Sequence, residues 1–240
     1  MKQSDNERLL KRWREIIDHV RGQLSDLLWQ REQIRRIGKM IEENPRLLAS
    51  DKPFLWDARR WYMFFAVMRI RSQADNDEDV YSLRRVLEEM REHPECFSES
   101  YALELIQKDG QHLDSGFVQT LADGLWNDFR TDGGDFDTAA LDADIQHLHD
   151  ISKEVRRLAN KSIAHVTKQG ILNEPKLTFD DLDKCIDAFD AITVKYIVLL
   201  TGGAYSGGTL MPTEQFDWYE EFSFPWKPRE EGNWPGDSFE

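Results

Sequence analysis

The sequence predicts an all-α fold, and three observations support this class. Apolar residues recur at steps of three and four over most of the chain, as they do along the buried face of a helix. No stretch alternates between apolar and polar residues over a convincing length, so no sheet is expected. Glycine and proline fall at the ends of the periodic stretches, where helices stop. We therefore expect a helical bundle.

The first periodic stretch predicts a long N-terminal helix that ends at Pro45. Arg31 and Gly38 interrupt its apolar seam, which otherwise packs on a neighbouring helix. The seam consists of Trp13, Ile17, Val20, Leu24, Leu27, Ile34 and Ile41.

The middle of the chain predicts four shorter helices. Residues 61–68 are apolar nearly all round, which is typical of a helix at the centre of a bundle. Residues 77–92 form a helical pattern that Pro94 stops, and residues 98–130 carry two weaker patterns. A loop is expected at residues 131–135, where two glycines lie among aspartates.

The second half predicts two further helices. A strong apolar stripe from Leu141 to Leu158 runs directly into residues 160–165. Thr178 and Asp181 have the spacing of a capping box, so a helix is expected to begin there and to end at Gly202.

The C-terminal segment differs from the rest because it combines many aromatic residues with prolines that prevent a continuous helix. We expect one helical domain at 1–202, with a less regular, insertion-like region at 95–138. An aromatic arm at 203–240 would pack on the domain or on a partner subunit, or serve as a peptide-like recognition element.

Composition and charge restrict the classes of function. Lys and Arg total 31 against 45 Asp and Glu, a net charge of −14, so any contact with RNA would need a local basic patch. Cys96 and Cys185 are isolated, which favours a reducing cytoplasm. An apolar leader and a membrane-spanning stretch are both missing, so we expect a cytoplasmic protein that makes no membrane contact.

The sequence predicts neither a metal site nor a cofactor. Phosphate-binding glycine loops and the common hydrolase and zinc motifs are absent. His147 and His149 point about 200° apart on a helix and cannot share one ion there.

The segment from Arg156 to His165 carries the strongest chemical signal. Arg157, Lys161 and His165 follow one another at steps of four, so on a helix they lie within an arc of about 80°. An imidazole bordered by apolar side chains and cations stays neutral near pH 7 and can accept a proton from a ribose 2′-hydroxyl. The alternative is a hydrogen-bonded core histidine without a chemical role.

The run from Asn160 to His165 resembles the histidine motif of the HEPN superfamily, and the whole chain resembles its AbiU-type, abortive-infection branch. Residues 68–75 with 79–89 resemble the second marker of this branch. The tail around Trp218 and Trp226 resembles its ending.

This resemblance implies a HEPN-like helical bundle in phage defence or a toxin–antitoxin system. Members often form homodimers in which motif helices of two subunits meet. The resemblance thus implies a homodimer through the His165 helix, and an antitoxin or defence protein as a possible further partner. Catalytic members are metal-independent endoribonucleases. The alternatives are a non-catalytic module that binds RNA, a nucleotide or a protein, and a structural scaffold.

The sequence departs from the Arg-x(4–6)-His motif of catalytic members, because positions 158–160 hold Leu, Ala and Asn instead of the arginine. Arg156, Arg157 or Lys161 could take the place of the missing arginine, although lysine lacks its bidentate fork. The candidate catalytic residues are therefore His165, Arg157, Lys161 and Asn160, with Arg156 as a phosphate-binding candidate.

Arg69 and Arg71 form a second arginine-bearing element with two interpretations. They could pair with Asp75, Asp77 or Glu88 and tie two helices together. Alternatively, they could reach the Asn160–His165 cleft and bind phosphate. We interpret two other arginine pairs as solvated surface charges, namely Arg59–Arg60 and Arg84–Arg85.

Overall fold

The computed structural model describes residues 2–44, 53–160, 177–203 and 208–211. These ranges are helical almost throughout and contain no strand; their one sheet-like contact is a bridge between Arg130 and Phe136. The predicted all-α class is therefore confirmed. None of the helices in these ranges has the length and apolar character needed to cross a membrane.

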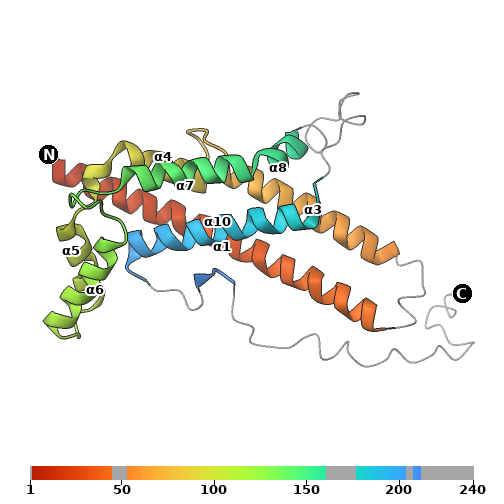
Figure 1. The fold of residues 1–240 in the computed structure, drawn as a ribbon, viewed down its shortest axis with the longest axis horizontal. Helices are drawn as coiled ribbons and strands as arrows, with labels where there is room; N and C mark the ends of the chain where they lie inside the picture. The colour runs from red at the N-terminus through yellow and green to blue at the C-terminus, as the bar shows by residue number, and fades with distance from the viewer. Residues whose placement is uncertain (1, 45–52, 161–176, 204–207, 212–240) are drawn as a thin grey trace, which may run out of the picture.

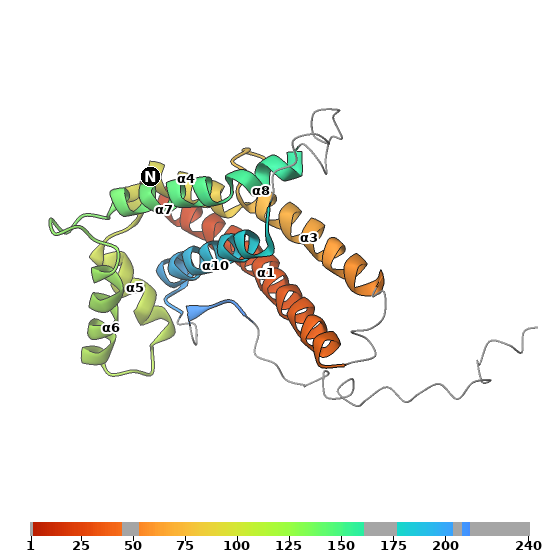
Figure 2. The same ribbon diagram turned by 45° about the vertical axis from the view of Figure 1, so that its right-hand side comes forward.

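Three long helices form the centre of the fold: α1 (Lys2–Glu43), α3 (Pro53–Gln73) and α10 (Phe179–Thr201). Each packs against the other two, and Figures 1 and 2 show α10 crossing α1. The predicted seam of α1 is confirmed because its first five members are at most 1% exposed. Burying each such side chain contributes about 1.5–3 kcal/mol to folding.

Both ends of α10 follow the predicted local chemistry. The Thr178 hydroxyl accepts a hydrogen bond from the Asp181 backbone N–H at 3.1 Å, and the Asp181 carboxylate accepts one from the Thr178 N–H at 3.2 Å. This is the predicted capping box. The helix ends at Gly202, whose φ of +68° is left-handed and favours glycine.

Helix α4 (Leu83–Glu92) begins later than the predicted start at Asp77. The aspartates before it form turns instead: Asp75 Oδ1 accepts from the Asp77 N–H, and Asp77 Oδ1 accepts from the Asp79 N–H. Ser82 then caps the helix with its hydroxyl. The apolar period continues into α4 as predicted, but side chain–backbone hydrogen bonds replace the helix between Asp77 and Ser82.

The predicted continuous stripe from residue 141 to 158 is divided into α7 (Thr138–Ile151) and α8 (Lys153–Leu158). The break is at Ser152, which is fully buried and donates its hydroxyl to the Leu148 carbonyl at 2.6 Å. Such back-bonding competes with regular helix geometry. As a result, α7 packs on α4 and α10, whereas α8 packs on α3.

A helical hairpin stands at the end of the bundle near the N-terminus (Figure 1). It consists of α5 (Glu99–Asp109) and α6 (Ser115–Asn127), which pack against each other and follow the short 3₁₀ helix η1 (Pro94–Cys96). The two weaker helical patterns are thus confirmed. So is the loop at 131–135, where Gly134 has a φ of +89°.

Helix α3 is central as predicted, but one of its apolar faces is exposed, which the prediction did not include. Val67 and Ile70 are fully buried, but Trp61, Phe64 and Met68 are 61%, 39% and 38% exposed. The neighbours of α3 cover only one side of it among the described elements, so the other side of this apolar helix meets solvent.

Arg84 and Arg85 are also not the solvated pair that was expected. Arg84 Nε donates to Glu88 at 2.9 Å, and Arg85 Nε donates to Glu89 at 3.0 Å, with both arginines mostly buried. Glu89 additionally accepts from Trp13 Nε1 at 3.0 Å, which joins α4 to α1. The pairs at i and i+4 were visible in the sequence, but their burial was not.

Candidate functional site

The predicted motif segment begins where α8 lies against α3 (Figure 2). Val155 and Ala159 are buried in the main core, and Leu158 packs partly against it. At 159 and 160 the backbone changes from an α-helix to a wider π-type turn. Turns of this kind are frequent at functional sites because they re-aim the side chains of a helix.

Arg71, at the end of α3, contacts the first residue of the predicted motif. Its Nε donates to Asn160 Oδ1 at 2.8 Å, although the two residues are 89 positions apart in the sequence. Asn160 is exposed and Arg71 is half-buried, so the pair is accessible from solvent. The contact places a guanidinium beside the position at which the motif lacks its arginine.

The ion pairs suggested for Arg69 and Arg71 do not form among the described residues. Arg69 lies over the Phe65 ring, 5.3 Å from its centroid, in a cation–π contact. Glu88 pairs with Arg84 instead. Arg71 therefore contacts the motif segment and does not pair with the suggested carboxylates. Phosphate binding by either arginine stays a prediction.

Arg156 is turned toward α7. Its Nη2 donates to the His149 carbonyl at 3.0 Å, and its buried Nε has no hydrogen-bond partner in the described structure. Burial, followed by the nearby charge of Arg84, lowers the pKa of Arg156. In this arrangement Arg156 ties α8 to the last turn of α7, where carbonyl groups lack helical partners.

The remaining candidates are less constrained. Arg157 Nη1 lies 3.4 Å from Glu154 Oε2, and both side chains are about half exposed. Lys161 and His165 lie outside the described residues, as does the aromatic arm from residue 212 onward. The geometry of the histidine therefore stays a prediction from the sequence.

The described ranges also bear on metal binding. They hold no group of three or more His, Cys, Asp or Glu side chains that could share an ion. His149 Nδ1 lies 3.2 Å from Asp150 Oδ1, and the pKa of this carboxyl is lowered by hydrogen bonds from Gln146 and from His149.

The arrangement brings together an amide and a guanidinium from two helices at the start of a histidine-containing segment. Sequence reasoning proposed both residues, but it could not select Arg71 over Arg69 as the one in contact. The family model of AbiU2, a HEPN-type family, matches residues 10–227 of the chain. Neither a curated protein nor a solved structure gives a significant match. Because that match spans most of the sequence, the chain belongs to the HEPN-type AbiU2 family.

Proposed function

We propose that this chain is a phage-defence protein that cleaves RNA at the junction of α3 and α8, without a metal, and that Arg71 replaces the arginine missing from its histidine motif. The observation that supports this is the 2.8 Å bond from Arg71 Nε to Asn160 Oδ1. Asn160 occupies the latest position at which the Arg-x(4–6)-His pattern would place its arginine.

The proposed chemistry divides the roles between three side chains. His165 takes the proton of a ribose 2′-hydroxyl, whose oxygen attacks the adjacent phosphorus. The bond to the 5′-oxygen breaks, the proton held by the imidazolium of His165 passes to the 5′-oxygen, and a 2′,3′-cyclic phosphate remains. Arg71 neutralises the charge that grows on the phosphorane, and Asn160 positions Arg71 by accepting from its Nε. That bond leaves the two Nη groups of Arg71 for phosphate oxygens.

We include a homodimer in this proposal, with the motif segments of two subunits forming one cleft. The exposed apolar face of α3 supports self-association, because Trp61, Phe64 and Met68 lie on the helix that also carries Arg71. Light scattering on a size-exclusion column should give a dimer for the wild type. A monomer that still cleaves RNA would contradict this part of the proposal.

The central experiment is cleavage of end-labelled RNA in the presence of a metal chelator. We expect His165→Ala and Arg71→Gln to lower the rate by about 10²–10³, the loss typical of removing one transition-state contact. Arg71→Lys should retain part of the rate, since lysine keeps the charge but loses the planar fork. Lys153→Gln is the matched control, because Lys153 is exposed on α8 and should leave the rate unchanged.

Two results would contradict the proposal. One is intact RNA at high protein concentration, which favours the non-catalytic module that binds RNA, a nucleotide or a partner protein. The other is cleavage that His165→Ala leaves unchanged, which would assign any activity to a contaminant or to another site. Parallel variants Arg157→Gln and Lys161→Gln show whether the nearby cations share the role of Arg71.

A further inference from the structure

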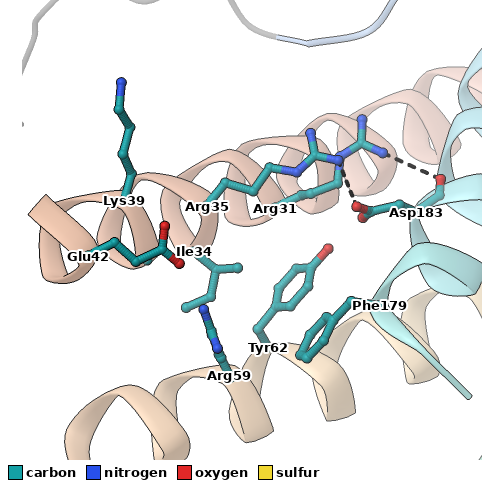
Figure 3. A pocket seen from close by; sticks show the side chains of 10 residues that line it. Arg31, Ile34, Arg35, Lys39, Glu42, Arg59, Tyr62, Phe179 and Asp183 are labelled. Carbon is teal, nitrogen blue, oxygen red and sulfur yellow. Dashed lines mark hydrogen bonds and ion pairs between the residues drawn. The ribbon is translucent and has the colours of Figure 1, made fainter. Parts of the chain in front are cut away.

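A pocket of about 360 Å³ lies between α1, α3 and α10, well away from the junction described above (Figure 3). Its volume is within the range of small-molecule sites. It lies where Arg31 and Gly38 interrupt the apolar seam of α1, so the interruption seen in the sequence marks a hollow between helices. Arg59 and Arg71 are twelve residues apart on α3, which separates the two regions by about 18 Å along the helix.

Positive charge is concentrated in this pocket although the chain as a whole is acidic. Four basic side chains and two acidic ones line it, against a net charge of −14 for the chain. Arg35 Nη2 pairs with Asp183 Oδ2 at 2.7 Å, and Arg31 pairs with Asp187. Lys39 Nζ also lies 3.7 Å from Glu43 Oε1. Three of the four lining cations are therefore paired, and Arg59 is the one without a carboxylate partner among the described residues.

Arg59 supplies charge that no residue in the described ranges pairs with. It forms no ion pair or hydrogen bond with any residue in the described ranges. Its Nη2 lies 3.3 Å from the point that a Cβ at Gly38 would occupy, so the glycine allows the guanidinium to lie close to α1. Figure 3 shows Arg59 extending from α3 toward Ile34. The fork is thus held between two helices with its N–H donors available.

The Tyr62 hydroxyl is the second unused donor. Tyr62 is 6% exposed, and its hydroxyl oxygen is buried without a hydrogen-bond partner in the described structure. The Tyr62 ring stacks on Phe179 with 6.3 Å between the ring centroids. Figure 3 shows the Tyr62 hydroxyl pointing into the pocket, toward Asp183. Burial is the main cause that raises the pKa of Tyr62, so the hydroxyl stays protonated and able to donate.

We propose that this pocket binds a phosphorylated small molecule, whose phosphoryl oxygens accept hydrogen bonds from the Arg59 fork and from the Tyr62 hydroxyl. A phosphomonoester dianion can pair with Arg59, the lining cation that no described carboxylate pairs, and its several oxygens can satisfy a bidentate guanidinium and a phenol together. Phe179 is half-buried and offers a flat surface beside these donors for the rest of the ligand. The site does not depend on the RNA chemistry proposed above.

Calorimetric titration of the full chain with inorganic phosphate, adenosine 5′-monophosphate and adenosine tests the proposal. Both phosphates should bind and raise the melting temperature, whereas adenosine should do neither. Tighter binding of the monophosphate than of phosphate would show that the ring surface contributes, and equal affinities would show that the phosphoryl group alone is recognised. Both results support the site.

The variants decide whether binding occurs in this pocket. Arg59→Gln should weaken phosphate binding about tenfold or more, and Tyr62→Phe about fivefold. Arg60→Gln is the matched control, because Arg60 is exposed and lies over Phe64 instead. Without ligand, Tyr62→Phe should not reduce the free energy of unfolding, since it removes a buried hydroxyl that has no partner. Adenosine binding as tightly as the monophosphate, no saturable phosphate binding, or full affinity in Arg59→Gln would each overturn the proposal.

Discussion

Replacing Glu89 by glutamine tests how α1 and α4 are joined. Glu89 is 5% exposed, and its carboxylate is shared by three donors from two helices. Trp13 Nε1 and Arg85 Nε donate to it at 3.0 Å, and Arg12 Nη2 lies 3.0 Å from it. Because every donor is satisfied by this one side chain, the cluster should respond strongly to loss of its charge.

The size of the effect follows from the burial of each partner. Glutamine keeps an oxygen for Trp13 but loses the charge opposite both guanidinium groups. Arg85 is mostly buried, and a hydrogen bond to a charged group contributes about 1.5–3 kcal/mol; Arg12 is 47% exposed, so its pair adds about 0.5 kcal/mol. We expect Glu89→Gln to lose about 2–3.5 kcal/mol. Glu89→Leu, which also leaves Trp13 without an acceptor, should lose about 3–5 kcal/mol.

Urea unfolding followed by circular dichroism and tryptophan fluorescence measures these losses. The midpoint should fall while the slope with urea stays unchanged, since the surface exposed on unfolding is the same. Glu92→Gln is the control on the exposed side of the same helix, and it should change stability by less than about 0.5 kcal/mol. A Glu89→Gln protein as stable as this control would refute the reasoning.

Three further predictions follow from buried or capped groups. Burial raises the pKa of Cys96 to about 11 and that of Cys185 to about 12, so both thiols should resist a thiol reagent near pH 8 until urea unfolds the chain. The Thr178 hydroxyl holds the pKa of Asp181 below its ordinary value of 3.8. At neutral pH, Asp181→Asn should therefore melt at a lower temperature than the wild type. This difference in melting temperature should disappear as the pH falls through the lowered pKa of Asp181, because the wild-type carboxylate is then protonated. Gly202→Ala should cost about 1–2 kcal/mol in thermal unfolding because of its left-handed φ, and unchanged stability would contradict that conformation.

The parts of the fold that the sequence predicted well depend on neighbours in the chain. The seam of α1 and the capping box of Thr178 and Asp181 are local patterns, so their period and spacing were sufficient. The late start of α4 and the break at Ser152 were missed for the opposite reason. There, short polar side chains bond to the backbone, and whether they do so depends on burial that a single sequence does not reveal.

The candidate site divides in the same way. Its residues could be proposed from the sequence, because an arginine, an amide and a histidine are recognisable in any register. The partner of Arg71 could not be predicted, since Asn160 lies 89 positions away and was one of several possible partners. The choice is made by the packing of α8 on α3, which the sequence did not predict because it showed one continuous stripe.

Helix α3 connects the proposals and also shows how to separate them. It carries Arg59 toward the pocket, Arg71 toward Asn160 and an apolar face toward solvent. A straight helix fixes the direction and spacing of these three surfaces, so any variant that tilts α3 would disturb all of them at once. Single polar replacements at Arg59 and Arg71 avoid this because neither side chain belongs to the buried core. If Arg59→Gln loses only phosphate binding and Arg71→Gln loses only RNA cleavage, the two sites are chemically independent. If each variant loses both activities, the substitutions have disturbed α3 as a whole, and α3 couples the pocket to the junction.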